Sequence, residues 1–199
     1  MPVVAGPDTG PVPSARRPGT TVVGVSFRPG AAPALLGIPA DELRDLRVPL
    51  TDVWGSDAAP LERGVDDASP PSVRHDLIER QLRRRLVRAE RPDDVVAAAV
   101  ARLRRPGRRR VRTLGDELGI SERQLLRRFD AAVGYGPKTL DRVLQFQRFL
   151  SSAPLVAKGE ARLARIAAEL GYADQAHLSR ECARLSGVTP QGLVANRPA

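Results

Sequence analysis

The spacing of hydrophobic residues changes near residue 72, from short runs to helical periodicity. Before this point, Pro2–Gly6 and Thr20–Phe27 are typical of strands, because valine and threonine are frequent in them and glycine or proline ends them. Ala31–Leu36 and Pro39–Leu46 favour short helices, and Pro39 suits a first helical position. Two strands alone form no stable sheet. We therefore interpret residues 1–71 as a small, partial β-containing region.

From residue 72 onward the apolar residues follow helical spacing. Ser72 is expected to cap an amphipathic linker helix over residues 72–91. One side of this helix carries Val73, Leu77, Leu82 and Leu86. Pro92–Asp94 predicts the start of the next helix, which ends at the basic run Arg104–Arg110. The apolar residues of that helix are Val96, Val100 and Leu103.

The second half of the chain contains an internal duplication. One set of five residues recurs 52 positions later: Leu114, Glu117, Leu118, Gly119 and Ile120 become Ile166, Glu169, Leu170, Gly171 and Tyr172. A second set recurs 53 positions later: Leu125, Phe129, Gly134 and Pro137 become Leu178, Cys182, Gly187 and Pro190. Each copy predicts a helix, a tight glycine turn and a second helix that begins at a capping residue, Ser121 or Asp174.

This arrangement is the layout of a helix-turn-helix, whose second helix enters the major groove of DNA. The predicted fold class is mainly α, with two such units joined by a long helix. The first unit spans residues 111–131, the joining helix residues 137–151 and the second unit residues 162–185, within a domain of residues 92–199. The second helices are expected over Ser121–Phe129 and from Asp174 to about Leu185.

Helical geometry assigns the faces of the two second helices. At about 100° per residue, Leu125 and Phe129 define a buried side, and Arg127 points away from it. Leu178 and Cys182 define the buried side of the second copy. Outward arginine suits guanine or phosphate, and glutamine suits adenine. A solvated helix face is the alternative interpretation for each residue taken alone.

Net charge differs between the first third of the chain and the remainder. The 199 residues carry +9, but residues 1–71 carry −3 and residues 72–199 carry +12. Arginine supplies 30 of the 32 cations, which favours phosphate and guanine as partners, although a GC-rich genome also raises the arginine content. The asymmetry predicts a polyanion as the partner of the second part.

Several classes of protein are not expected. No apolar run approaches the ~18 residues of a membrane span, and the first residues lack a signal-peptide pattern. The single cysteine, Cys182, excludes an internal disulfide and a multi-cysteine metal site. His75 and His177 have no ligands at metal-binding spacing, and no catalytic motif or phosphate loop occurs. We therefore expect a cytoplasmic protein that is not an enzyme and needs no cofactor or metal.

These motifs resemble the AraC/XylS family of transcription regulators. The resemblance covers about residues 93–197 and rests on Gly119–Ile120–Ser121 with Leu125, Arg127 and Phe129, and on Leu170–Gly171–Tyr172 with Asp174, Leu178 and Arg180. Cys182 departs from the family pattern, which usually has phenylalanine there. The resemblance implies two helices that contact successive major grooves. The residues expected to contact DNA are Ser121, Arg123, Gln124, Arg127, Arg128, Gln175, Ala176, His177 and Arg180, with Arg108 and Arg109 on the backbone.

Residues 20–71 resemble the end of the cupin-like sensor domain that precedes such units in some regulators. Val22–Phe27, Leu43–Asp45 and Val48–Leu50 carry this resemblance. Most of the expected preceding strands are missing, so we expect either a start upstream of Met1 or a truncated regulator.

The function expected from these observations is sequence-specific binding of double-stranded DNA as a transcription regulator. RNA polymerase and an unidentified small-molecule effector are the further expected partners, and a membrane is not. The alternative is a basic helical module that binds an acidic protein without reading a DNA sequence.

Overall fold

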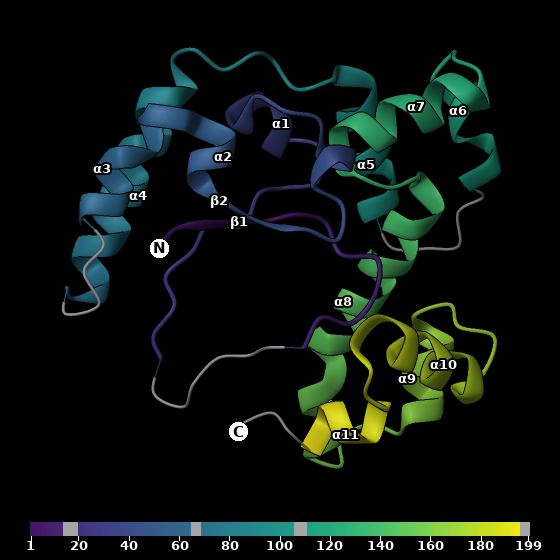
Figure 1. Ribbon diagram of the computed structural model, residues 1–199. Helices are drawn as coiled ribbons and strands as arrows, with labels where there is room; N and C mark the ends of the chain where they lie inside the picture. Colours follow the sequence, from purple (N-terminus) through teal and green to yellow (C-terminus); the bar gives the residue numbers. More distant parts are fainter. Residues whose placement is uncertain (14–19, 65–68, 106–110, 196–199) are drawn as a thin grey trace.

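A computed structural model describes residues 1–13, 20–64, 69–105 and 111–195 (Figure 1). The chain is mainly helical, with a small antiparallel sheet near the amino terminus. The elements of the amino-terminal part are β1 (Val3–Ala5), α1 (Ala32–Leu36), η1 (Ala40–Leu43), β2 (Arg47–Pro49), α2 (Leu50–Trp54), η2 (Gly55–Ala58), α3 (Ala59–Gly64) and α4 (Pro71–Leu86). The remaining elements are α5 (Asp94–Arg104), η3 (Val111–Thr113), α6 (Leu114–Glu117), α7 (Glu122–Val133), α8 (Pro137–Ala157), α9 (Leu163–Glu169), α10 (Gln175–Ser186) and α11 (Pro190–Ala195).

The amino-terminal unit consists of the sheet and the short helices around it. β1 pairs antiparallel with β2, so that Val4 lies opposite Val48. Its buried residues are Leu36, Leu43, Leu50, Trp54, Ala58 and Leu61. The helices give the two strands the apolar cover that a hairpin alone lacks.

Two predictions for this unit are wrong. Residues 20–27 form no strand, and Val22 and Val25 are 57% and 45% exposed. A strand needs a partner for its backbone groups, and the sheet in the described residues consists of β1 and β2 alone, so this segment pairs with neither. The helix predicted for Pro39–Leu46 is a single 3₁₀ turn preceded by Pro39. It ends before Asp45, whose φ of 57° is incompatible with a right-handed helix.

Helix α4 packs on this unit through only part of the predicted apolar set. Leu77, Ile78 and Leu82 pack against the amino-terminal core, whereas Val73 and Leu86 are 50% and 62% exposed. Ser72 is not the cap either, because the helix starts at Pro71 and no side chain caps it. The helix ends at Leu86 rather than near residue 91.

The two helix-turn-helix units have separate cores that share α8. Leu140 and Leu144 of α8 pack in the first core beside Leu125 and Phe129 of α7. Phe149 of α8 packs in the second core. The helix therefore covers one unit with its first half and the other with its second half (Figure 1).

Two helices are longer than predicted. Helix α8 reaches Ala157 instead of residue 151, with Pro154 inside its last turn. Helix α7 continues beyond Phe129 to Val133, where Gly134 takes a φ of 89° and ends it. In contrast, α5 starts within Pro92–Asp94 as predicted, and Asp93 caps it, since its carboxylate accepts from the backbone N–H groups of Val95 and Val96.

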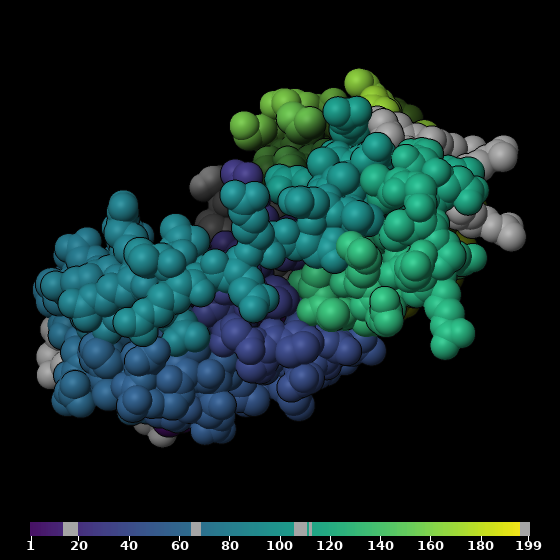
Figure 2. Space-filling view, turned by 90° about the horizontal axis from the view of Figure 1, so that it is seen from above, coloured from purple at the N-terminus to yellow at the C-terminus, as the bar shows by residue number. Residues whose placement is uncertain are grey.

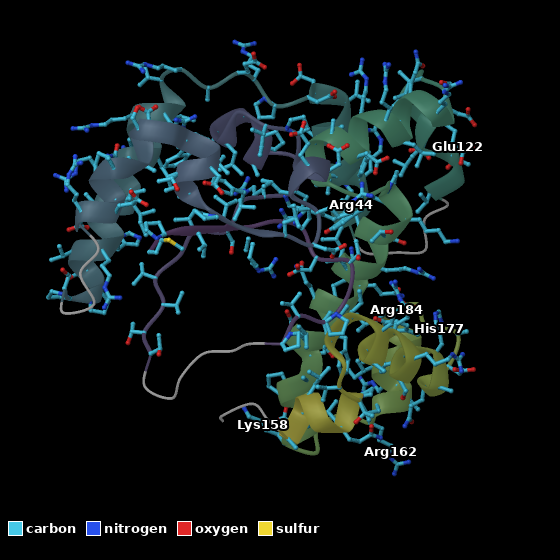
Figure 3. The ribbon with its side chains drawn as sticks, viewed as in Figure 1. Arg44, Glu122, Lys158, Arg162, His177 and Arg184 are labelled. Carbon is cyan, nitrogen blue, oxygen red and sulfur yellow. The ribbon has the colours of Figure 1, made fainter. Side chains whose placement is uncertain are left out.

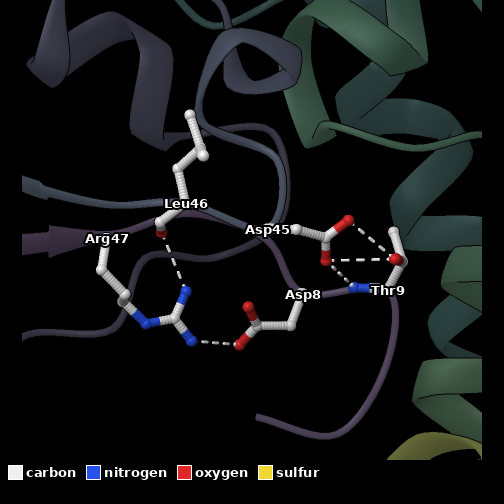
Figure 4. A network of polar contacts seen from close by, with 5 residues as sticks. All are labelled: Asp8, Thr9, Asp45, Leu46 and Arg47. Carbon is white, nitrogen blue, oxygen red and sulfur yellow. Dashed lines mark hydrogen bonds and ion pairs between the residues drawn. The ribbon is translucent and has the colours of Figure 1, made fainter.

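The first residues of the chain are held by a polar network (Figure 4). The Asp45 carboxylate accepts from the backbone N–H of Thr9 at 2.7 Å and from its hydroxyl at 2.8 Å. Arg47 donates to Asp8 at 2.6 Å. The hydrogen bonds from Thr9 lower the pKa of Asp45. Residues 8 and 9 are thereby fixed beside β2.

Candidate nucleic-acid interface

The first helix-turn-helix has a tight glycine turn followed by a fully capped helix. Gly119, with φ of 68°, donates to Asp116, and the N–H of Ile120 donates to the carbonyl of Gly115 at 3.0 Å. Ser121 then accepts from the N–H of Gln124, and the Gln124 side chain accepts from the N–H of Ser121. This capping box fixes the first residue of α7.

The second unit repeats this turn 52 positions later. Gly171, with φ of 83°, donates to Ala168, and Tyr172 donates to the carbonyl of Ala167 at 2.9 Å. Asp174 replaces the serine cap and accepts from the N–H of His177 at 2.6 Å. The duplication seen in the sequence is therefore also a duplication of backbone hydrogen bonds.

The outward face of α7 carries the predicted arginines. Leu125 and Phe129 are buried, whereas Arg123 and Arg127 are exposed. Gln124 is exposed as well, but its side-chain oxygen accepts from Ser121. Of these predicted residues, Arg123 and Arg127 present their charged ends to solvent.

Arg128 is partly exposed and forms an ion pair within the protein. Its guanidinium lies 3.1 Å from the carboxylate of Asp93, the residue that caps α5. The position 53 residues later is Glu181, which is 8% exposed and contacts Arg142 of α8 at 3.6 Å. Both contacts attach the second helix of a unit to the helix before that unit.

On α10 the predicted residues differ in exposure. Gln175, Ala176 and Arg180 are exposed. His177 is half-buried: its Nδ1 accepts from the N–H of Ala173 at 3.2 Å, and its ring lies edge-on to Tyr172. This contact leaves the Nε2 atom as the outward donor of a neutral ring.

The amino ends of the two helices lie on the same side of the molecule. Figure 3 shows Glu122 at the start of α7 and His177 in the first turn of α10, both at the right of the view. The amino-terminal turns of α7 and α10 thus lie on one side in this view. Arg108 and Arg109 lie outside the described residues.

The amino-terminal unit contacts the end of α7, which the sequence did not predict. Arg44 donates to the carbonyl of Gly134 and lies 3.1 Å from the carboxylate of Asp130 (Figure 3). A Cβ added to Gly134 would lie 2.2 Å from Pro7. These contacts join residues 86 to 127 positions apart, and no local pattern identifies such pairs.

Two other groups of side chains carry no separate chemistry. His75, Asp76 and Glu79 lie close together on α4, but all are exposed and Glu79 binds Arg83 at 2.7 Å. Burial raises the pKa of the Cys182 thiol to about 12, which keeps it protonated at neutral pH. A protonated, fully buried thiol is a packing group rather than a nucleophile.

Comparison with protein families agrees with this geometry. Residues 114–196 match the model of a helix-turn-helix domain of AraC type, and residues 1–49 match a domain of unknown function (DUF6597) typical of AraC-like regulators. No curated protein and no solved structure matches the chain. None of the helices in the described ranges is both long and apolar enough to cross a membrane. The chain therefore contains, at residues 114–196, a helix-turn-helix domain of AraC type, the kind of domain with which transcription regulators bind DNA.

Proposed function

We propose that the protein regulates transcription by binding one specific DNA sequence, with α7 and α10 in successive major grooves. The observation that carries this proposal is the repeated, capped turn, which gives both helices the same local geometry and exposes their outward faces. A second helix held in this way is the element that reads bases in helix-turn-helix proteins. The charge of +12 on residues 72–199 favours a polyanionic partner.

Individual residues have distinct roles in this proposal. Arg123 and Arg127 donate to guanine or phosphate, and Arg180 does so from α10. Ala176 suits the methyl group of thymine, and the Nε2 group of His177 donates to a base or phosphate acceptor.

The other predicted residues act partly through their contacts within the protein. Ser121 and Gln124 fix the start of α7, and Arg128 holds α7 against α5. Gln175 is the first residue of α10 and suits a phosphate contact. We include Arg108 and Arg109 as backbone contacts on the basis of their charge alone.

Selection from a random DNA library, followed by fluorescence anisotropy on the selected duplex, tests this function. Arg123→Ala and Arg127→Ala should each weaken binding by about 1–3 kcal/mol and relax the preference at one base pair. Arg63→Ala, an exposed arginine on α3, is the matched control and should change little. Wild-type affinity and footprint in the Arg123→Ala/Arg127→Ala double variant would contradict the assignment.

The alternative, a basic module that binds an acidic protein, predicts a different response to salt and sequence. DNA readout requires a steep fall of log K with log salt together with discrimination between duplexes. Arg108→Ala/Arg109→Ala should weaken binding to every duplex alike and flatten the salt slope. Equal affinity for all duplexes would favour the alternative.

We also propose RNA polymerase as a partner, because a regulator must change the use of a promoter. Transcription in vitro from a promoter beside the selected site should change when the protein is added. Variants that lose DNA binding should lose this effect, and an unchanged transcript level with wild type would contradict the proposal.

A further inference from the structure

A groove of about 1250 Å³ is lined by residues of both the amino-terminal unit and the first helix-turn-helix. Residues around α1 form one wall, α4 and the segment after it form another, and Arg127, Arg128, Ala131 and Ala132 of α7 form the third. Figure 2 shows the surface hollowed between α4 and the first helix-turn-helix. The groove is therefore shared between a sensor-like unit and a helix proposed to read DNA.

Cations predominate in this groove. Six arginines face three carboxylates along its lining. Two of the six are neutralised, because Arg85 binds Asp57 at 2.9 Å and Arg128 binds Asp93 at 3.1 Å. The other four donate no side-chain hydrogen bond and form no ion pair within the described residues: Arg84, Arg88, Arg91 and Arg127. They give the groove an excess of unpaired positive charge.

The groove also has a polar side chain and an apolar wall. Gln81 lines it and is 7% exposed, and no hydrogen bond joins its side-chain amide to another residue in the described part of the chain. The amide is not enclosed by the protein, so it is free to donate to or accept from a molecule in the groove. Pro33, Ala34 and Ile38 supply an apolar surface nearby.

We propose that this groove binds a small organic anion with an apolar body. Its acidic group lies among Arg84, Arg88, Arg91 and Arg127, its apolar body lies against α1 and the following turn, and Gln81 binds a polar atom of the ligand. The DNA backbone is the competing occupant. A concave site with an apolar wall and an amide beside its arginines fits a compact organic anion better than a string of hydrated phosphates.

Occupancy of the groove is coupled to DNA binding through Arg127, and this step rests on the proposed function. Arg127 lines the groove and is also a proposed base-reading residue. One guanidinium cannot serve the anion and a guanine fully at the same time, so the ligand weakens DNA binding. Reciprocity requires that DNA weaken ligand binding by the same factor.

The test uses the fluorescent anion 8-anilinonaphthalene-1-sulfonate and its neutral analogue N-phenyl-1-naphthylamine, with the full chain and no DNA. The anion should bind saturably at one site, and the Arg84→Gln/Arg88→Gln variant should weaken it by about tenfold. The same variant should change binding of the neutral analogue by less than about twofold. Arg80→Gln, on the same helix outside this groove, is the control and should change neither. Gln81→Leu should also weaken binding of the anionic probe.

Each result has one meaning for the proposal. Unchanged anion binding in the double variant, or equal affinity of wild type for both probes, would overturn it. Weaker DNA binding by Arg84→Gln/Arg88→Gln without probe would assign these arginines to the DNA backbone and also overturn it. If the protein binds no DNA duplex while the anion still binds as expected, the proposed function is contradicted and the proposed anion site is supported. If the DNA duplex and the anion both bind and neither weakens the other, the proposed coupling through Arg127 is contradicted.

Discussion

Gly134 and Gly119 both adopt left-handed backbone conformations, but their surroundings differ. Gly134 has a φ of 89° and faces Pro7 and the carbonyl of Ala40. Gly119 has a φ of 68°, and an added Cβ would meet nothing within 4 Å. Gly119 is therefore required only by its turn, whereas Gly134 is required both by its turn and by the close contact with the amino-terminal unit.

Replacing each glycine by alanine separates these two requirements. Gly119→Ala should cost about 1–2 kcal/mol, the usual cost of a left-handed alanine. Gly134→Ala should cost more, because its Cβ would lie 2.2 Å from Pro7. It should also detach the amino-terminal residues from α7. Urea unfolding measures the first effect and limited proteolysis the second. Equal losses in both variants would contradict the domain contact.

At the scale of elements, equivalent positions of the two helix-turn-helix units carry opposite charges, and each forms an ion pair with a residue at or within the preceding helix. Arg128 of α7 binds Asp93 before α5, and Glu181 of α10 binds Arg142 of α8. Both pairs fix the second helix of a unit relative to a neighbouring helix. The repeat in the sequence does not reveal this, because arginine at position 128 is replaced by glutamate at the equivalent position 181. Side chains of α8 also bind the carbonyls that end both neighbouring helices: Gln145 donates to Leu170, and Arg148 donates to Leu103.

The cap of α7 can be tested by a single substitution. Ser121→Ala removes the acceptor for the N–H of Gln124 and should cost about 1 kcal/mol, or roughly 2–4 °C in Tm. Ser151→Ala is the matched control, because Ser151 lies within α8 and bonds only to the carbonyl of Gln147. DNA affinity should fall with Ser121→Ala as the start of α7 frays. An unchanged Tm would show that the capping box contributes little.

At the scale of the whole molecule, the amino-terminal unit lies against the end of α7. Arg44 makes this contact from the residue after η1, through both Gly134 and Asp130. The pair with Asp130 is partly exposed and therefore contributes modestly. The bond to the Gly134 carbonyl adds the larger part, because it satisfies a helix-end acceptor.

Arg44→Ala should loosen this contact without unfolding either unit. We expect a loss of roughly 1 kcal/mol and faster hydrogen exchange in peptides that span residues 130–136. Peptides from α9 and α10 should exchange as in wild type. Arg47→Ala, which breaks a pair within the amino-terminal unit, is the control and should leave residues 130–136 unchanged. Faster exchange there in both variants would argue against a specific role for Arg44.

The accuracy of sequence interpretation follows the range of the interactions. Ser121, Gly119 and Asp174 were predicted correctly as turn and cap residues, because the groups that they bind lie within a few positions. The strand expected at 20–27 was wrong because pairing depends on a distant segment, and in the described residues the pairing joins Val3–Ala5 with Arg47–Pro49 instead. The groove and the contact of Arg44 depend on how the units pack, which periodicity does not encode.

The amino-terminal residues touch both helix-turn-helix units at equivalent turns. Pro7 lies at Gly134, and a Cβ added to Gly187 would lie 3.5 Å from Pro11. A second, noncovalent connection therefore runs beside α8, and residues 8–10 span it. In the proposed mode of DNA binding, the distance between α7 and α10 sets the separation of the two DNA segments that these helices reach. On that proposal, we expect a chain with inserted residues at 8–10 to prefer operators with a different spacer, which would give this short segment a part in the choice of operator.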